Sequence, residues 1–325
     1  MTKKNILIIT NCQGRKLVSQ FLCCGSPELA GGLSLMEFPQ AQLITKDHRE
    51  SFRDRFAAAD IILAQPLFGS PLEELRPGNL TSAARDAGKL LITFPSLRFT
   101  SISYSLVGVK WRDYPLHPFE GSEDTVIAAL FAAGLSPSEA ARLYHEVPLA
   151  SEEALLENVK SDIIGLRERE RRAKLNVGMS DFYEQNWRKS RLHYTNEHPY
   201  GSVYVEVATR LAPYFGVTDF QQDLVRDVVG NNFTSLPIKR WVAKNLKLEF
   251  EDDPDLALSE NKELPFISML ERFWDFYGKV GRAEVIQRLN SENSFREALK
   301  AFNNISGSTA LSDQRPKPRR WWPFK

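Results

Sequence analysis

The sequence lacks the features that would place it at once in a common class. Its three cysteines, Cys12, Cys23 and Cys24, have no metal-ligand spacing, and the adjacent pair could bridge each other only with strain. We therefore expect neither a disulfide framework nor a bound metal. Lys and Arg number 42 against 41 Asp and Glu, so a net charge of +1 creates no global attraction for nucleic acid or membranes. Any anion binding must be local.

Long hydrophobic runs are also missing. The first run, Ile6–Ile9, is shorter than the ~7 residues of a signal-peptide core, and no run approaches the ~18 of a membrane span. We therefore expect a cytoplasmic protein. The phosphate-binding patterns G-x-G-x-x-G and G-x-x-x-x-G-K-[ST] are absent, which argues against a dinucleotide-binding or P-loop protein.

Short hydrophobic runs, each followed by a polar break and then helical periodicity, fill the first 100 residues. Each run is too short for a core helix, so we interpret all of them as strands. They are Ile6–Ile9, Leu33–Phe38, Ile61–Ala64 and Leu90–Phe94. Strands that alternate with helices predict an α/β fold with a parallel, doubly wound sheet and helices on both of its faces.

The later chain is predicted to be mainly helical. Ser136 and Glu139 form a capping box around Pro137, and a long helix over about 152–173 has Leu156, Val159, Ile163 and Leu166 on one side. The charge run 167–172 is interpreted as a solvated helical face rather than an anion site. A strand at 192–195 and helices at 204–211 and around 273–277 complete the expectation.

We expect three segments along the chain. These are an α/β catalytic domain over 1–217, a helical extension packed on it over 218–310, and a flexible tail over 311–325. The tail carries Trp321, Trp322 and Phe324 among basic residues. It could rest on an anionic membrane surface, dock a partner of a glycan-assembly complex, or be a disordered end.

Polar residues follow each predicted strand at the edge where parallel sheets collect ligands. These strand ends are Asn11-Cys12-Gln13-Gly14, Gln65-Pro66, Pro95-Ser96 and Asn196-Glu197-His198-Pro199. We therefore expect a site built from Asn11, Cys12, Gln13 and His198, with Gln65, Ser96 and Glu197 as pocket or oxyanion-binding groups.

Cys12 would lie at the start of a helix, and Gly14 suits a tight turn between strand and helix. Backbone N–H groups at such a position lower a thiol pKa and stabilise an oxyanion. The alternative is a small buried hydrophobic residue at a strand end. Of the five histidines, His198 is the strongest candidate for a base, since a loop fixed by Pro199 could aim it at Cys12, while His193 and His117 are weaker.

Several segments taken together resemble the WcbI-type polysaccharide-biosynthesis proteins, firmly over about 4–217 and loosely to about 280. The segments that carry the resemblance are "TNCQG", "FPSLRF", "LFAAGLSPSEAARLY", the helix end at 166–172, "MSDFYEQNWRKSRLHYTNEHP" and "VATRLAPYFG". The order and spacing of these segments make the match specific.

The resemblance implies a fold similar to the SGNH hydrolases, with Asn11, Cys12 and Gln13 at the place of the nucleophile turn. It also implies coenzyme A binding and acetyl transfer to a capsular or other surface polysaccharide precursor. Two departures from the family pattern stand out. Glu197 replaces a more common Asn before the His-Pro pair, and Ser103-Tyr104 stands where the family often has His-Pro.

Acetyl transfer has two chemical routes here. Cys12 either takes the acetyl group itself, or His198 activates the sugar hydroxyl for direct attack on acetyl-CoA while Cys12 and nearby N–H groups hold the oxyanion or the coenzyme A sulfur. The phosphates of coenzyme A would need cations, and Arg15, Lys16, Arg98 and Arg191 adjoin the site motifs. An esterase or deacetylase on the same fold, or a non-catalytic binding protein of a glycan-assembly complex, are the competing functions.

Overall fold

A computed structural model describes residues 3–22, 26–108, 111, 114, 117–119, 122–222, 234–259 and 262–307 of the chain. It divides into two compact units, each built from two stretches of sequence: Met1–Leu106 with Ala150–Phe266, and Val107–Leu149 with Ile267–Lys325. The domain boundaries expected after residues 217 and 310 stay a prediction, and the basic, aromatic tail lies outside the described residues.

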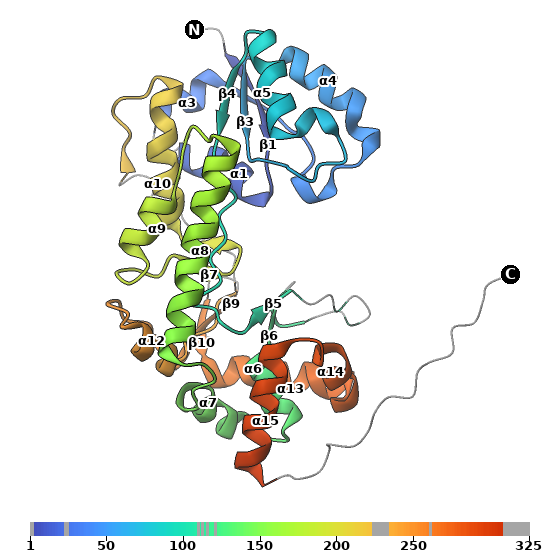
Figure 1. Cartoon of the computed structure of the whole chain (residues 1–325), viewed down its shortest axis with the longest axis vertical. Helices are drawn as coiled ribbons and strands as arrows, with labels where there is room; N and C mark the ends of the chain where they lie inside the picture. The colour runs from blue at the N-terminus through green and yellow to red at the C-terminus, as the bar shows by residue number, and fades with distance from the viewer. Residues whose placement is uncertain are drawn as a thin grey trace, which may run out of the picture. The chain divides into compact units, whose positions relative to one another are not determined.

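The first unit contains a four-stranded parallel sheet in the order β2-β1-β3-β4 (Figure 1). Its strands are β1 (Lys4–Ile9), β2 (Leu33–Met36), β3 (Ile61–Ala64) and β4 (Leu90–Thr93). All four strands predicted from short hydrophobic runs are confirmed. The runs are apolar because a strand covered on both faces of the sheet needs apolar side chains on both faces.

Helices cover both faces of this sheet. The connections are α1 (Cys12–Lys16), η1 (Leu17–Leu22, a π-helix), α3 (Pro27–Gly32), η2 (Ala41–Leu43), η3 (Lys46–His48), α4 (Arg49–Ala58), η4 (Glu73–Leu75) and α5 (Pro77–Asp86). Phe52 of α4 and Leu80 of α5 pack in one core with Leu7 and Ile62 of the sheet. Right-handed crossovers place α1 and η1 on the opposite face. The predicted three-layer α/β fold is confirmed.

The rest of the first unit is mainly helical. It contains α8 (Glu152–Ala173), α9 (Ser180–Asn186), β7 (His193–Thr195), β8 (His198–Pro199), α10 (Gly201–Leu211), η5 (Ala212–Phe215), α12 (Arg240–Leu246), β9 (Leu256–Ser259) and β10 (Lys262–Pro265). The long helix predicted over 152–173 is confirmed. Its buried stripe, however, uses Leu155 rather than Leu156, together with Val159, Ile163 and Leu166.

The second unit is built around a buried helix. Its elements are β6 (Glu123–Asp124), α6 (Thr125–Ala132), α7 (Pro137–Glu146), α13 (Phe266–Val280), α14 (Arg282–Leu289) and α15 (Asn293–Ser306), and β5 (Leu106–Val107) spans the boundary. Residues Val126–Leu130 are completely buried, as expected for a helix that is apolar all round. The capping box of Ser136 and Glu139 is confirmed at the start of α7.

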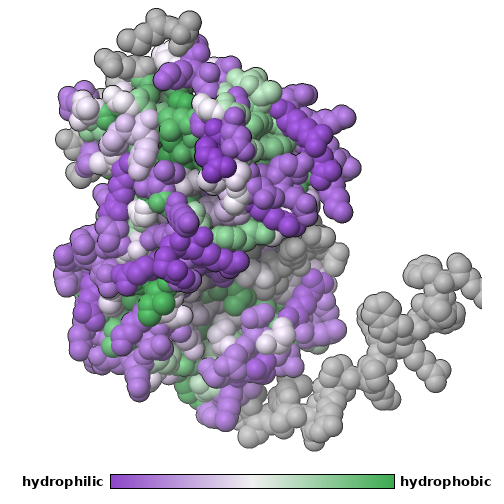
Figure 2. Space-filling model, turned by 45° about the horizontal axis from the view of Figure 1, so that its top comes forward, coloured by the Kyte–Doolittle hydropathy of each residue, from purple (hydrophilic) through white to green (hydrophobic). Residues whose placement is uncertain are grey.

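Hydrophilic residues cover most of the molecular face seen in Figure 2, with hydrophobic residues in separate patches. No helix in the described parts of the chain is long and apolar enough to cross a membrane.

Candidate active site

From β1 the chain adds β2 on one side, and β3 and β4 are then added on the other side. The order in which strands are added therefore reverses between β1 and β3, although all four strands are parallel. In open parallel sheets, ligands bind outside the carboxyl ends of the strands at such a point. Ile9 of β1 pairs with Ala64 of β3, and Gln65 N donates to Ile9 O at 3.0 Å. The turn after β1 and Gln65 after β3 therefore lie side by side at this edge.

The turn after β1 is shaped by Asn11 and Gly14. Asn11 is the N-cap of α1: its Oδ1 accepts from Gln13 N at 2.9 Å, while its Nδ2 donates to Ser96 Oγ at 3.2 Å. A Cβ at Gly14 would lie only 2.4 Å from the Cβ of Thr10, so any other residue would push the helix away from the strand. Asn11, Ser96 and Cys12 are thus brought together as the strand-end rule predicts.

Two buried glutamine amides fix the turn to its neighbours. Gln13 Nε2 donates to the carbonyl oxygens of Leu97 and Glu197, at 2.7 and 2.8 Å, and Gln13 Oε1 accepts from Leu97 N. Gln65 Oε1 accepts from Asn11 N at 2.9 Å, and its Nε2 donates to Gln13 and to Pro95 O. Because the amide donors of both side chains are used within the protein, we reassign Gln13 and Gln65 from catalytic or oxyanion-binding groups to positioning residues.

Cys12 is a free cysteine exposed at the start of α1. Although the residue is exposed, the surrounding protein removes part of the water around the sulfur, and this desolvation raises the pKa of the Cys12 thiol above its ordinary value. The Glu197 carboxylate raises this pKa further. The backbone N–H groups of Cys12 and Gln13 lower this pKa, as the sequence argument expected, but they are outweighed. The expected depressed thiol pKa is therefore corrected: the sulfur is held mainly as a thiol at neutral pH.

The loop that carries His198 is tied to the same edge of the sheet. Gln13 holds the carbonyl of Glu197, and Phe99 N donates to Asn196 O at 3.0 Å. The strand predicted at 192–195 forms as β7, but it pairs only with β8 and does not join the parallel sheet. The hairpin of β7 and β8 therefore presents Glu197 and His198 beside the Asn-Cys-Gln turn.

His198 is half-buried, and its Nδ1 lies 2.7 Å from Thr195 Oγ1. Burial lowers the pKa of His198; the Glu197 carboxylate opposes this effect and the Lys16 ammonium adds to it. The ring is therefore neutral at neutral pH and able to accept a proton.

Lys16 acts on the two candidate catalytic groups, Cys12 and His198, and not only as a candidate phosphate-binding cation. Its Nζ is 5.6 Å from the ring centroid of Tyr204, and burial lowers its ammonium pKa, while charge on Cys12 raises it. Lys16 and Glu197 each shift the pKa values of both Cys12 and His198. Sequence reasoning missed Tyr204, which lies outside the motifs, and Thr195, which belongs to a quoted segment but precedes the polar strand end. Only the fold of α10 and β7 brings these two side chains to this edge.

The other candidate cations have different surroundings. Arg98 is exposed and forms no ion pair with any described residue. Arg191 instead donates to Asp252 at 2.5 Å and to Ser235 Oγ and Leu236 O at 2.6 and 2.7 Å. Its guanidinium is committed to this internal network, so we withdraw it as a phosphate-binding residue. The side chain of Arg15 lies outside the described residues.

The weaker histidine candidates are structural. His193 Nε2 lies 2.6 Å from Tyr183 Oη, and burial lowers the pKa of His193 to about 3, so the ring stays neutral. His117 belongs to the second unit, where its Nε2 lies 3.0 Å from the buried Glu123 carboxylate. In the described segments no group of His, Cys, Asp and Glu could hold a metal ion.

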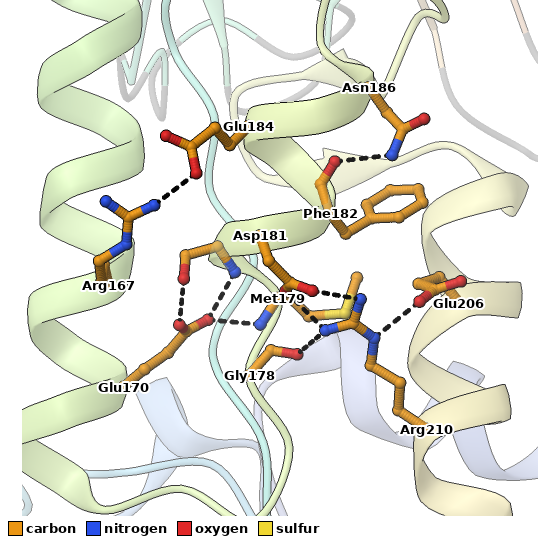
Figure 3. Close-up of polar contacts among 11 residues, drawn as sticks. Arg167, Glu170, Gly178, Met179, Asp181, Phe182, Glu184, Asn186, Glu206 and Arg210 are labelled. Carbon is orange, nitrogen blue, oxygen red and sulfur yellow. Dashed lines mark hydrogen bonds and ion pairs between the residues drawn. The ribbon is translucent and has the colours of Figure 1, made fainter.

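A polar network links α8, α9 and α10 (Figure 3). Glu170 of α8 accepts from the backbone N–H groups of Met179 and Ser180 and so caps α9. Arg210 of α10 donates to both carboxylate oxygens of Asp181, at 2.6 and 2.9 Å, and to Glu206 at 2.7 Å. This network links α10, the helix that carries Tyr204, to α9, and α9 in turn to α8.

The chain is similar to known polysaccharide-biosynthesis proteins. A family model described as the polysaccharide biosynthesis enzyme WcbI matches residues 5–219. A solved structure described as WcbI, a novel polysaccharide biosynthesis enzyme, superimposes with a TM-score of 0.66 at 19% identity, over 93% of this chain and 99% of that one. That structure is the native protein without a disulfide bond between coenzyme A and one of its cysteines. No curated protein matches the chain.

Proposed function

The chain belongs to the WcbI family of polysaccharide biosynthesis enzymes, and on that premise we propose that it is a coenzyme A-binding O-acetyltransferase. Its acceptor would be a hydroxyl of a capsular or other surface polysaccharide precursor, and acetyl-CoA would be the donor. One observation carries the proposal: Gln13 ties the backbone of Glu197 to the Cys12 turn, which brings a thiol and a neutral imidazole to one sheet edge. The description of the similar WcbI structure names coenzyme A together with one of that protein's cysteines, which supports coenzyme A as the donor's carrier.

The protonation states favour direct transfer over a covalent intermediate. A covalent route needs a Cys12 thiolate, but burial and Glu197 raise the pKa of Cys12, and the lowered pKa of His198 opposes formation of an imidazolium. A thiolate–imidazolium pair is therefore not favoured before substrate binds.

The direct route requires the His198 tautomer in which Nδ1, 2.7 Å from Thr195 Oγ1, carries the proton, so that Nε2 can take the proton from the acceptor hydroxyl. The hydroxyl oxygen attacks the thioester carbonyl, the C–S bond breaks, and the imidazolium returns the proton to the leaving sulfur of coenzyme A. The thiol of Cys12 and its own backbone N–H would face the reacting carbonyl and sulfur, because the N–H groups of Gln13 and Gly14 already donate to Asn11. Arg98 and Lys16 are the candidate cations for the phosphates, and Arg15 remains a prediction.

Release of coenzyme A thiol tests the function, measured with acetyl-CoA in the presence and absence of a polysaccharide acceptor. Acceptor-dependent release that falls about 10²–10⁴-fold in His198→Gln, but not in His48→Gln, supports the transferase. Equal release without acceptor would instead identify an esterase that gives the acyl group to water. Coenzyme A binding without any turnover would identify a binding protein.

Intact mass after incubation with acetyl-CoA alone separates the two routes. The direct route predicts no acetyl adduct in the wild-type protein and residual transfer in Cys12→Ala. An adduct of one acetyl group that is lost in Cys12→Ala would establish the covalent route instead.

A further inference from the structure

A groove of about 600 Å³ opens in the first unit beside the carboxyl ends of β3 and β4. Its walls come from these strands, from α5 and from the end of α8. The lining residues are Ala64, Gln65, Pro66, Leu75, Pro77, Gly78, Leu80, Thr81, Ala84, Arg85, Lys89, Leu91, Thr93, Arg172, Ala173, Lys174, Leu175 and Asn176. Small-molecule sites typically measure ≈ 300–1,000 Å³, so the groove has the size of a nucleotide site.

The charge of this lining is one-sided. It contains four cationic residues, Arg85, Lys89, Arg172 and Lys174, and no Asp or Glu. The chain as a whole is nearly neutral, with a net charge of +1, so the groove concentrates positive charge locally. Positive charge concentrated in a cleft favours an anionic ligand.

Two of these cations form no direct ion pair, although the Arg172 charge contributes to the lowered pKa of the Glu168 carboxyl. Neither Arg172 nor Lys174 forms an ion pair within the described part of the chain, and the Arg172 guanidinium lies 4.4 Å from the centre of the Phe68 ring. Lys89 Nζ donates to the carbonyls of Ala57 and Ala59, which leaves its charge unneutralised, while Arg85 pairs with the neighbouring Asp86. Arg172 is exposed, in agreement with the interpretation of the 167–172 run as a solvated face, and its guanidinium borders the groove.

The groove also adjoins the candidate active site through one shared side chain. Gln65 lines the groove, and its amide contacts both Asn11 N and Gln13 Oε1 on the turn that carries Cys12. Asn176, another lining residue, accepts from Thr93 N and Oγ1 through its Oδ1, which leaves its Nδ2 as a donor for a ligand. Leu75, Leu80 and Leu91 add apolar surface.

We propose that this groove binds a small molecule that carries a diphosphate group, with Arg172 and Lys174 contacting the phosphates. A guanidinium binds phosphate oxygens in pairs and an ammonium binds them as a point charge, so the two cations match two adjacent phosphates. Such a diphosphate belongs either to coenzyme A or to a nucleotide-linked sugar. The proposal holds whether or not the protein transfers acetyl groups.

The sharpest variant is Gly78→Asp, which places a negative charge in the groove. A Cβ at Gly78 meets nothing within 4 Å, and an acidic residue in the first turn of α5 favours the helix. The complementary variant is Arg172→Gln with Lys174→Gln. Gly278→Asp is the matched control, since it makes the same charge change at an open position on α13 of the other unit.

Isothermal titration of the full-length protein with ADP and UDP is the measurement, with adenosine and uridine as uncharged probes. We expect both diphosphates to bind, the nucleosides to bind far more weakly, and both groove variants to lose about tenfold or more in affinity. Gly278→Asp should bind as the wild type does. Thermal melting checks that Gly78→Asp remains folded.

Titration with coenzyme A distinguishes the two sources of the diphosphate, and either result agrees with the proposal. A parallel loss of coenzyme A affinity, with competition by UDP, identifies the donor substrate as the occupant. Unchanged coenzyme A affinity identifies a separate nucleotide-linked ligand. The proposal is overturned if neither diphosphate binds, or if both groove variants bind them as tightly as the wild type. Failure of acetyl transfer would leave these binding results untouched.

Discussion

Gln13 Nε2 donates to the main-chain oxygen of Glu197 at 2.8 Å, across 184 positions of sequence. Gln13 is 2% exposed, and the same amide nitrogen also donates to Leu97 O. This side chain therefore joins the turn after β1, the loop after β4 and the β7–β8 hairpin. It converts three separate strand ends into one site.

Replacing Gln13 by Met should test this role. The thioether keeps the size of the side chain but leaves the Leu97 and Glu197 carbonyls and the Leu97 N–H without partners, and we expect a loss of about 2–4 kcal/mol in the free energy of unfolding. Gln13→Glu can still accept from Leu97 N but places a buried carboxyl oxygen against the Leu97 and Glu197 carbonyls, so it should lower both the free energy of unfolding and kcat. Urea denaturation and steady-state kinetics measure both effects.

Gln42→Met is the control for these variants, because the Gln42 side chain is exposed and its amide donates to the nearby Gln40 Oε1. It should leave stability and activity unchanged. Unchanged kinetics in a folded Gln13→Glu protein would show that the tie to Glu197 does not position the site.

A pair of charge-removing variants should move the pH dependence of the site in opposite directions. Glu197 raises the pKa values of Cys12 and His198, and Lys16 lowers both. Activity by the direct route requires neutral His198, so it should rise as pH increases through a pKa below the ordinary value of 6.5. Glu197→Gln should shift this acid limb to lower pH, and Lys16→Met should shift it to higher pH.

The thiol provides a second reading of the same prediction. The pH profile of Cys12 alkylation by iodoacetamide, followed by intact mass, should shift downward in Glu197→Gln and upward in Lys16→Met. Shifts of the same sign in both variants, or no shift in either, would mean that these charges do not act on the two groups.

The sequence predicted the sheet well because its signals are local. Ile61–Ala64 is a strand in both the prediction and the structure, and its apolar run follows from burial on both faces. The roles of Gln13, Gln65 and Arg191 were not predictable in this way. Their partners lie tens of residues or more away, and an amide or guanidinium looks the same in sequence whether it meets a carbonyl, a carboxylate or a ligand.

The protonation state of Cys12 shows the same limit. Its place at the start of a helix was predicted from the Asn-Cys-Gln-Gly turn, and the backbone N–H groups do lower its pKa. Burial and the Glu197 carboxylate act in the other direction, and both come from segments that the local sequence does not contain. The sign of the net shift therefore depended on the tertiary structure.

Gly14→Ala should disrupt the turn that presents Cys12. The new Cβ would lie 2.4 Å from Thr10 Cβ, and neither atom can rotate away, so the helix start must move. We expect a loss of about 2–3 kcal/mol in the free energy of unfolding, together with loss of coenzyme A binding. Gly278→Ala, at an open and exposed helical position, should not be destabilising. Equal melting temperatures and affinities for the two variants would contradict the steric argument.

Arg210→Met should weaken the network that holds α10 against the start of α9. Arg210 donates to Asp181, Glu206 and Gly178 O, and its side chain is 28% exposed while that of Asp181 is 57% exposed. Because Asp181 is solvent-screened, we expect a loss of only about 1–2 kcal/mol at neutral pH. Arg171→Met removes an exposed pair with Glu168 and should have no measurable effect.

The stability lost in Arg210→Met should depend on pH through the Asp181 carboxyl. Hydrogen bonding to Arg210 lowers the pKa of Asp181 below its ordinary value of 3.8, so the pair stabilises the folded state above that pH. This stabilisation disappears as pH falls through the lower folded-state pKa and Asp181 becomes protonated. Urea denaturation of wild type and Arg210→Met should therefore give a stability difference that is full at pH 7 and smaller near pH 3. A difference that stayed constant across this range would assign the effect to packing of the Arg210 side chain rather than to the ion pair.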